Sequence, residues 1–286
     1  MEWLGHAMVS VAFSVAFSYA GYRKRSLDAS GGLAAFVVGL LTCLAGYRFA
    51  AVLILFFISS SFLTKLSPHK KRKIEADFKE GGQRDWLQVV ANALLGTLLC
   101  VVWLQAVGVG DRYFLDFGAQ PVPSLILAAF LGHYACCNGD TWASELGVLA
   151  KGSPVLITTF KQVPKGTNGA LSPLGTAASL GGGLFLGLVF FISSALFCVE
   201  PTSAPQWPVI LVGGFAGFVG SLLDSLLGAT LQYSGFCSRQ QKVVSQPGPT
   251  VKHLTGADLL TNGQVNFVSA LLTAPLTAAV TYAVMA

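Results

Sequence analysis

Two carboxylates stand where a long apolar run ends. Residues 122–137 are apolar, and Asn138-Gly139-Asp140-Thr141-Trp142-Ala143-Ser144-Glu145 follows them directly. A carboxylate so close to a bilayer is costly unless it serves a site. Oxygen ligands of this kind suit Mg2+, which usually shares them with a substrate phosphate. The segment therefore predicts the catalytic end of a membrane enzyme: Asp140 and Glu145 hold Mg2+, and Asn138 and Thr141 contact substrate.

Helix geometry places a condition on this metal site. The side chains of Asp140 and Glu145 would point about 140° apart on a regular helix. They converge only if the helix begins or breaks near Gly139, and glycine permits such a break. We therefore expect the apolar helix to end at this point.

A third carboxylate, Asp224, lies on the small and polar face of another apolar segment, with Ser221 at helical spacing. A charge inside the membrane needs a cation or another partner. Asp224 is either a third Mg2+ ligand or one half of a structural ion pair with a basic residue such as Lys65 or Lys161. Other apolar segments carry polar residues at the same end, which predicts a polar cavity: Ser61, Thr64, Gln88, Asn92, Asn262, Asn266 and Ser269.

Basic and hydroxyl groups that could bind phosphate gather in loops. The segment Lys161-Gln162-Val163-Pro164-Lys165-Gly166-Thr167-Asn168-Gly169 offers ammonium groups and backbone N–H donors, although an ordinary basic turn would look the same. It lacks the preceding glycine and strand of a Walker loop. We expect substrate phosphates to be bound by Lys65, Arg84, Lys161 and Lys165 and oriented by Thr167, Asn168, Ser221 and Asn262.

The elements that position these residues are apolar helices. With 53% hydrophobic residues and 31 charged side chains among 286 residues, the chain has too few charges for a soluble surface. We expect an all-α, polytopic membrane helix bundle that forms one integral membrane domain over residues 1–286 and has a polar cavity at its cytosolic side. The second and third of the eight expected spans could instead form one interrupted hairpin. The spans are residues 3–22, 32–46, 49–63, 86–109, 122–137, 174–198, 207–231 and 265–284.

Basic residues orient this bundle. Residues 23–31, 64–85, 138–173 and 232–263 carry 16 of the 18 Lys and Arg residues, which predicts that these long loops are cytosolic. The same distribution explains the net charge of +5 without nucleic acid as a partner. No basic segment precedes the first apolar run, so we expect no cleaved leader. Gly181-Gly182-Gly183 leaves room either for a lipid tail or for close helix packing.

Seven sequence blocks spread over the chain, from residues 26–31 to residues 258–262, closely resemble the transmembrane protein nineteen family. This family belongs to the same superfamily as plant phytyl-phosphate kinase. The resemblance implies a lipid-directed phosphotransferase, and the absence of a plastid-type presequence suggests the endoplasmic reticulum or another endomembrane. The matching blocks are Ser26-Leu27-Asp28-Ala29-Ser30-Gly31, Ser59-Ser60-Ser61-Phe62-Leu63-Thr64-Lys65, Lys79-Glu80-Gly81-Gly82-Gln83-Arg84, residues 138–147, residues 163–169, residues 220–232 and Asp258-Leu259-Leu260-Thr261-Asn262.

Together these features predict a Mg2+-dependent prenyl-phosphate kinase. A nucleoside triphosphate, CTP by the plant-type resemblance, would give its γ-phosphoryl group to an isoprenoid monophosphate. The acceptor phosphate is already ionised at neutral pH, so the site needs no strong general base. Two alternatives stay open: a membrane transporter or flippase of a lipid or phosphorylated substrate, and another phospho-group transferase that acts on a lipid alcohol. Transport would favour polar residues along a path through both leaflets, and the polar residues here cluster at one end.

Overall fold

The apolar runs form long helices, because a helix satisfies its own backbone N–H and C=O groups in lipid. The computed structural model describes residues 2–66, 74 and 82–286. Seven helices in this part are long and apolar enough to cross a membrane, and α2 is a shorter apolar helix. The predicted polytopic bundle is confirmed, and the second and third spans are separate helices. The helices are α1 (Glu2–Arg23), α2 (Ala29–Ala45), α3 (Tyr47–Thr64), α5 (Trp86–Ala106), α6 (Pro121–Gly147), α7 (Pro173–Phe197), α8 (Pro208–Leu231) and α9 (Asn262–Met285).

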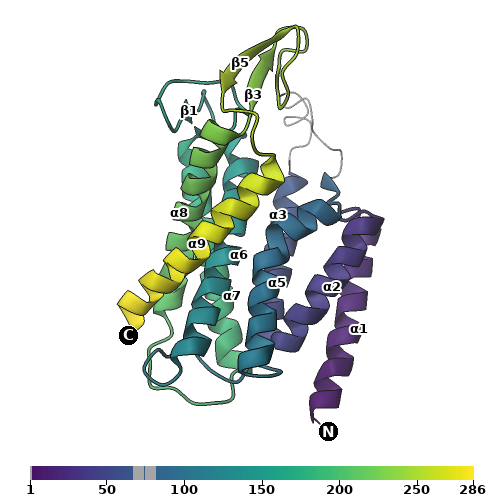
Figure 1. The fold of residues 1–286 in the computed structure, drawn as a ribbon, viewed down its shortest axis with the longest axis vertical. Helices are drawn as coiled ribbons and strands as arrows, with labels where there is room; N and C mark the ends of the chain where they lie inside the picture. The colour runs from purple at the N-terminus through teal and green to yellow at the C-terminus, as the bar shows by residue number, and fades with distance from the viewer. Residues whose placement is uncertain (1, 67–73, 75–81) are drawn as a thin grey trace.

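Successive helices run in opposite directions, so both termini lie at the end of the bundle away from the strands (Figure 1). We call the strand-bearing end, with residues 24–28, 148–172 and 232–261, the polar end. Side chains cap helices that begin there: Asp28 accepts from the Gly31 amide, and Asp85 and Gln88 form a capping box. These caps replace hydrogen bonds that a helix cannot make in its first turn. Of the basic loop at residues 64–85, residues 67–73 and 75–81 lie outside the described residues, and they include Lys79-Glu80-Gly81.

Short strands at the polar end depart from the all-α prediction. They are β1 (Val155–Leu156), β2 (Ala170–Leu171), β3 (Ser234–Cys237), β4 (Lys242–Val244) and β5 (Val251–Thr255). The first two pair with each other, and the other three form an antiparallel sheet in the order β4-β3-β5. Strands of two to five residues are too short for an alternating pattern to stand out in the sequence.

Glycines bring α6, α7 and α8 into backbone contact at the centre of the bundle. A Cβ atom on Gly183 would lie 2.2 Å from the carbonyl oxygen of Gly213, and one on Gly139 would lie 2.7 Å from the Cα atom of Gly217. Small residues allow such close helix packing in membranes. Gly182 also packs against Asn138 and Trp142, so this glycine-rich segment serves helix packing.

The end of the bundle opposite the polar end is closed by a buried ion pair. Arg48 Nε lies 3.5 Å from Asp111 Oδ1, and neither side chain is more than 2% exposed. The guanidinium also donates to the Tyr113 carbonyl and lies over the rings of Phe49 and Trp103. This pair ties the start of α3 to the connection between α5 and α6. The ion pair and the aromatic rings around it fill the interior of the bundle at the end opposite the polar end.

Candidate active site

A cavity of about 660 Å³ opens between the helix ends at the polar end. It is lined by α3, α5, α6, α7, α8 and α9, together with the loop before α7. The predicted polar cavity is therefore present in the structure. Of the residues expected to do chemistry, it brings together Arg84, Asp140, Thr141, Glu145, Lys165, Thr167, Asn168, Ser221, Asp224 and Asn262.

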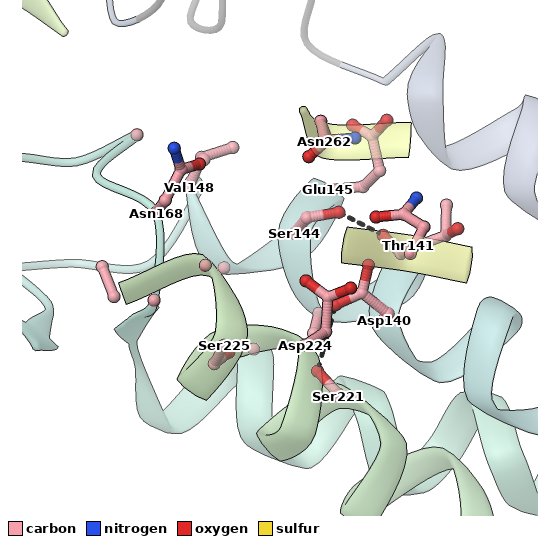
Figure 2. Close-up of a pocket in the computed structure, with 18 of the residues that line it drawn as sticks. Asp140, Thr141, Ser144, Glu145, Val148, Asn168, Ser221, Asp224, Ser225 and Asn262 are labelled. Carbon is pink, nitrogen blue, oxygen red and sulfur yellow. Dashed lines mark hydrogen bonds between the residues drawn. The ribbon is translucent and has the colours of Figure 1, made fainter. Parts of the chain in front are cut away.

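Asp140 of α6 and Asp224 of α8 form the centre of this cavity (Figure 2). Gly139 directly precedes Asp140, and Gly217 lies about two turns before Asp224, so the contact between these glycines brings the two helices together close to both carboxylates. Ser221 donates to Asp140 Oδ1 at 3.5 Å. The two carboxylates are partly buried and face each other across the interface of α6 and α8.

The expected helix break at Gly139 is wrong. α6 continues without interruption to Gly147, so the span predicted to end at residue 137 is ten residues longer. Glycine serves here for close contact with α8, which the sequence of α6 alone does not show. Asp140 and Glu145 consequently point to different parts of the cavity wall, as a regular helix requires.

The carboxylate pair has the chemistry of a site for a hard cation. In the part of the chain that the structure describes, neither Asp140 nor Asp224 forms an ion pair, and Ser269 donates to Asp224 at 3.0 Å. Nor do three His, Cys, Asp or Glu side chains among the described residues gather into a group that could hold a metal. Mg2+ commonly needs only one or two carboxylates, because water and phosphate complete its coordination. The pair therefore fits Mg2+ that arrives with a substrate phosphate.

Arg84 and Glu145 face the cavity from another wall. The Arg84 guanidinium donates to Ser61 Oγ at 2.8 Å and lies over the ring of Phe57. Burial lowers the pKa of Arg84, whereas the nearby carboxylate of Glu145 raises it. The side chain stays protonated under all ordinary conditions. Glu145 thus lies close enough to Arg84 to influence its pKa.

The loop with Lys165, Thr167 and Asn168 covers the opposite side of the cavity. The Asn168 side chain donates to the Tyr233 carbonyl at 3.1 Å, and its backbone N–H donates to Ser234 Oγ at 3.0 Å. Gly169 has a φ of +75°, and a Cβ atom there would clash with Ala229 of α8. The Lys165 ammonium donates to the Ala150 and Val148 carbonyls just after α6. These contacts hold the loop over the end of α8.

Three residues expected at the site lie outside the cavity lining. Lys65 donates to the Lys24 carbonyl and to Ser26 Oγ, so it fastens α3 to the turn after α1. Asn138 is fully buried; it accepts from Ser59 and donates to the Gly182 carbonyl, so it joins α3, α6 and α7. Lys161 is exposed in its loop. Neither lysine forms an ion pair with Asp224 within the described part of the chain.

The sequence interpretation missed the contribution of α7. Ser172, Thr176 and Ser179 line the cavity, and they recur at a spacing of three to four residues at the start of that helix. The spacing is present in the sequence, but our interpretation of this segment considered only the neighbouring glycines. Residues 243–245 of β4 and its flank also reach the cavity, and no feature of the sequence predicted that.

The fold and site define a polytopic helical membrane protein with a carboxylate-centred polar cavity at one end of the bundle. A family model supports the same class, because the model described as integral membrane protein DUF92 matches residues 12–274. The chain belongs to this DUF92 family of integral membrane proteins. No solved structure matches the chain.

Relatives from plants and archaea share most of the chain. Protein PGR of Arabidopsis thaliana is 47% identical over 270 residues, which cover 94% of this chain and 93% of that protein. An uncharacterized membrane protein of Methanocaldococcus jannaschii is 28% identical and covers 84% of this chain and 89% of its own length. Protein VTE6, chloroplastic, of Arabidopsis thaliana is 29% identical over 72% of this chain and 56% of that protein.

The relatives do not test the predicted kinase activity, the Mg2+ or the nucleotide. The family model and the seven long apolar helices establish a multi-pass membrane protein, and none of the three relatives carries the name transmembrane protein nineteen. Among these three relatives, VTE6 is the one whose name states a compartment, and that compartment is the chloroplast. The endoplasmic reticulum expected from the sequence thus has no support among them.

Proposed function

We propose that this protein is a prenyl-phosphate kinase, which transfers the γ-phosphoryl group of a nucleoside triphosphate to an isoprenoid monophosphate. One observation carries the proposal: Asp140 and Asp224 face each other in a polar cavity that the partly buried Arg84 and the loop residue Lys165 also line. The cavity lies at the end of membrane helices, where a lipid phosphate and a water-soluble nucleotide can meet. The resemblance to the phytyl-phosphate kinase superfamily favours the same reaction.

The reaction needs positioning and charge neutralisation more than proton transfer. An oxygen of the acceptor phosphate attacks the γ-phosphorus, a new P–O bond forms, and the bond to the β-phosphate oxygen breaks. The products are a prenyl diphosphate and a nucleoside diphosphate, and no proton has to leave the acceptor. Cationic side chains and a metal ion can stabilise the charge on the transferred group.

Each group in the cavity has a role in this scheme. Asp140 and Asp224 would hold Mg2+, which when bound draws charge from the phosphate oxygens. Arg84 binds a phosphate as a planar fork of N–H donors. Lys165 gives up carbonyl partners to bind the nucleotide, and Thr167 and Asn168 orient its phosphates. Ser221 keeps the Asp140 carboxylate turned toward the cavity.

The closed opposite end favours an enzyme over a transporter. A transporter requires a polar path that can open to both sides of the membrane. Here the interior beyond the cavity holds Phe130, Trp103 and the Arg48–Asp111 ion pair, all of them buried. Transport would have to break that ion pair. The polar groups of the cavity serve chemistry at one surface.

A liposome assay separates these two functions. Purified protein is reconstituted with prenyl monophosphates or prenyl alcohols and supplied with Mg2+ and either CTP or ATP. We expect prenyl diphosphate from the monophosphates alone and no movement of substrate between leaflets. If no prenyl diphosphate forms and the substrate moves measurably between leaflets, the proposal is contradicted. A diphosphate or monophosphate product from an alcohol would instead indicate the other phosphotransferase activity.

The orientation of the protein and its compartment form part of the same proposal. We propose that the polar end lies in the cytosol, on the basis of the basic loops, and that the membrane is an endomembrane. Tags near Lys242 and Asp116 test the orientation, because these residues lie at opposite ends of the bundle. Only the first tag should be accessible from the cytosol. Fluorescence from a tagged chain identifies the organelle, and plastid fluorescence would contradict the location.

A further inference from the structure

A second pocket lies beside the polar cavity and has a different character. It is enclosed by apolar parts of α1, α2, α3 and α5. α2 packs against both α3 and α5, whereas α3 and α5 make few direct contacts with each other, so a gap remains between them. The apolar walls of this pocket include Phe17, Leu27, Val38, Leu53, Phe57 and Ala93.

The two cavities share one wall. Phe56, Arg84, Gln88 and Asn92 line both of them. A molecule placed across this wall would have one end among carboxylates and amides and the other among aliphatic and aromatic side chains. Arg84 stands at the junction, with its guanidinium over the ring of Phe57. A cation at the border of an apolar pocket is complementary to an amphiphile with an anionic head.

We infer that the apolar pocket between α3 and α5 holds the isoprenyl chain of the acceptor, whose phosphate is bound by Arg84. This inference rests on the proposed function and assigns the two substrates to opposite sides of the cavity. The acceptor approaches from α3 and α5, and the nucleotide approaches from the loop with Lys165 and Asn168. Asp140 and Asp224 line the same cavity as Arg84, Lys165 and Asn168, and the phosphoryl group is transferred there.

The size of the pocket determines which part of the chain it recognises. Its volume of about 50 Å³ corresponds to roughly four water-sized groups. One isoprenyl unit has five carbons, so the pocket takes at most about one unit, the one next to the phosphate, and the remaining chain lies in the bilayer. The site therefore recognises the first isoprenyl unit, and the length of the chain beyond it has little effect on binding.

Substitutions that fill the pocket test this assignment. Ala93→Leu adds three carbons to its wall, and Ala35→Leu does the same from α2. Ala16→Leu is the matched control, because Ala16 is exposed on α1 beside the pocket residue Phe17. We expect the KM for farnesyl monophosphate to rise about tenfold or more in both pocket variants, since they displace buried carbons. The nucleotide KM, and both constants in the control, should stay within about twofold of wild type.

Photolabelling gives a readout that needs no turnover. The probe is a prenyl monophosphate that carries a diazirine on its first isoprenyl unit, added to reconstituted protein without nucleotide. We expect label on residues 53–57 and 89–93. Unlabelled farnesyl monophosphate is added as a competitor and should reduce this label. The label should fall about tenfold in Ala93→Leu and stay unchanged in Ala16→Leu. If Ala93→Leu does not fold, as judged by its thermal midpoint, Ala35→Leu provides the same comparison.

The two experiments separate failure of the pocket from failure of the reaction. Label confined to the lipid-facing sides of α7, α8 or α9, or label that Ala93→Leu and Ala35→Leu leave unchanged, would overturn the pocket assignment. Normal diphosphate formation with an unchanged farnesyl monophosphate KM in the filled variants would do the same and leave the kinase proposal intact. Label in the pocket without any diphosphate would support the pocket and contradict the kinase.

Discussion

Replacing Asp224 by asparagine should stabilise the protein in the absence of ligand. Two carboxylates meet in the cavity, and within the described part of the chain no cation pairs with either of them. Two like unit charges that face each other at about 4 Å would repel by roughly 4 kcal/mol at an effective dielectric constant of about 20. Cavity water reduces this, so Asp224→Asn should add about 1–2 kcal/mol to the free energy of unfolding. The amide oxygen can still accept from Ser269.

The assay is the thermal midpoint of purified wild type and Asp224→Asn, with and without Mg2+ and nucleotide. A gain of 1–2 kcal/mol corresponds to an increase of about 2–8 °C for a chain of this size. Ligand should raise the wild-type midpoint, because it binds the native state, and Asp224→Asn should lose that increase. Glu200→Gln controls for the loss of an exposed charge. A variant that melts lower without ligand and still responds fully to Mg2+ and nucleotide would refute the reasoning.

Three further changes test other parts of the structure. Gly139→Val should destabilise the protein by about 3 kcal/mol and abolish turnover, because its side chain would collide with Gly217 of α8; an unchanged midpoint would contradict the close packing. Arg48→Met should cost about 3–5 kcal/mol by leaving Asp111 buried without its partner, and denaturation that matches wild type would contradict this role. Lys165→Ala should raise the nucleotide KM, whereas Lys161→Ala at its exposed position should not; equal effects would show that the cavity does not separate the two lysines.

The helices could be predicted from the sequence because each one is a charge-poor apolar run bounded by polar residues. The alternation of loops and the clustering of basic residues then indicated which helix ends lie together. The polar stripe with Ser221 and Asp224, together with polar residues at the same end of other apolar segments, predicted a cavity at that end. Local pattern and membrane physics determine these features, and neither depends on the details of tertiary contacts.

The pairing within the cavity could not be predicted in the same way. Asp140 meets Asp224 because Gly139 and Gly217 let two helices touch, and that contact joins residues far apart in the chain. Glu145 follows the regular turn of α6 and lies near Arg84, so proximity in sequence was misleading. Lys65 looked like a phosphate ligand because of its charge, yet it binds the turn after α1. Long-range packing decides such assignments.

Transfer of labelled phosphate tests the central claim most directly. Purified wild type and Asp140→Asn are incubated with Mg2+, γ-labelled CTP or ATP, and farnesyl monophosphate, and the lipid products are separated. The account predicts labelled farnesyl diphosphate from the wild type and at least about a hundredfold less from Asp140→Asn, because the amide no longer offsets the charge of the metal. Unlabelled lipid in the wild-type reaction, or equal label with a folded Asp140→Asn protein, would contradict it.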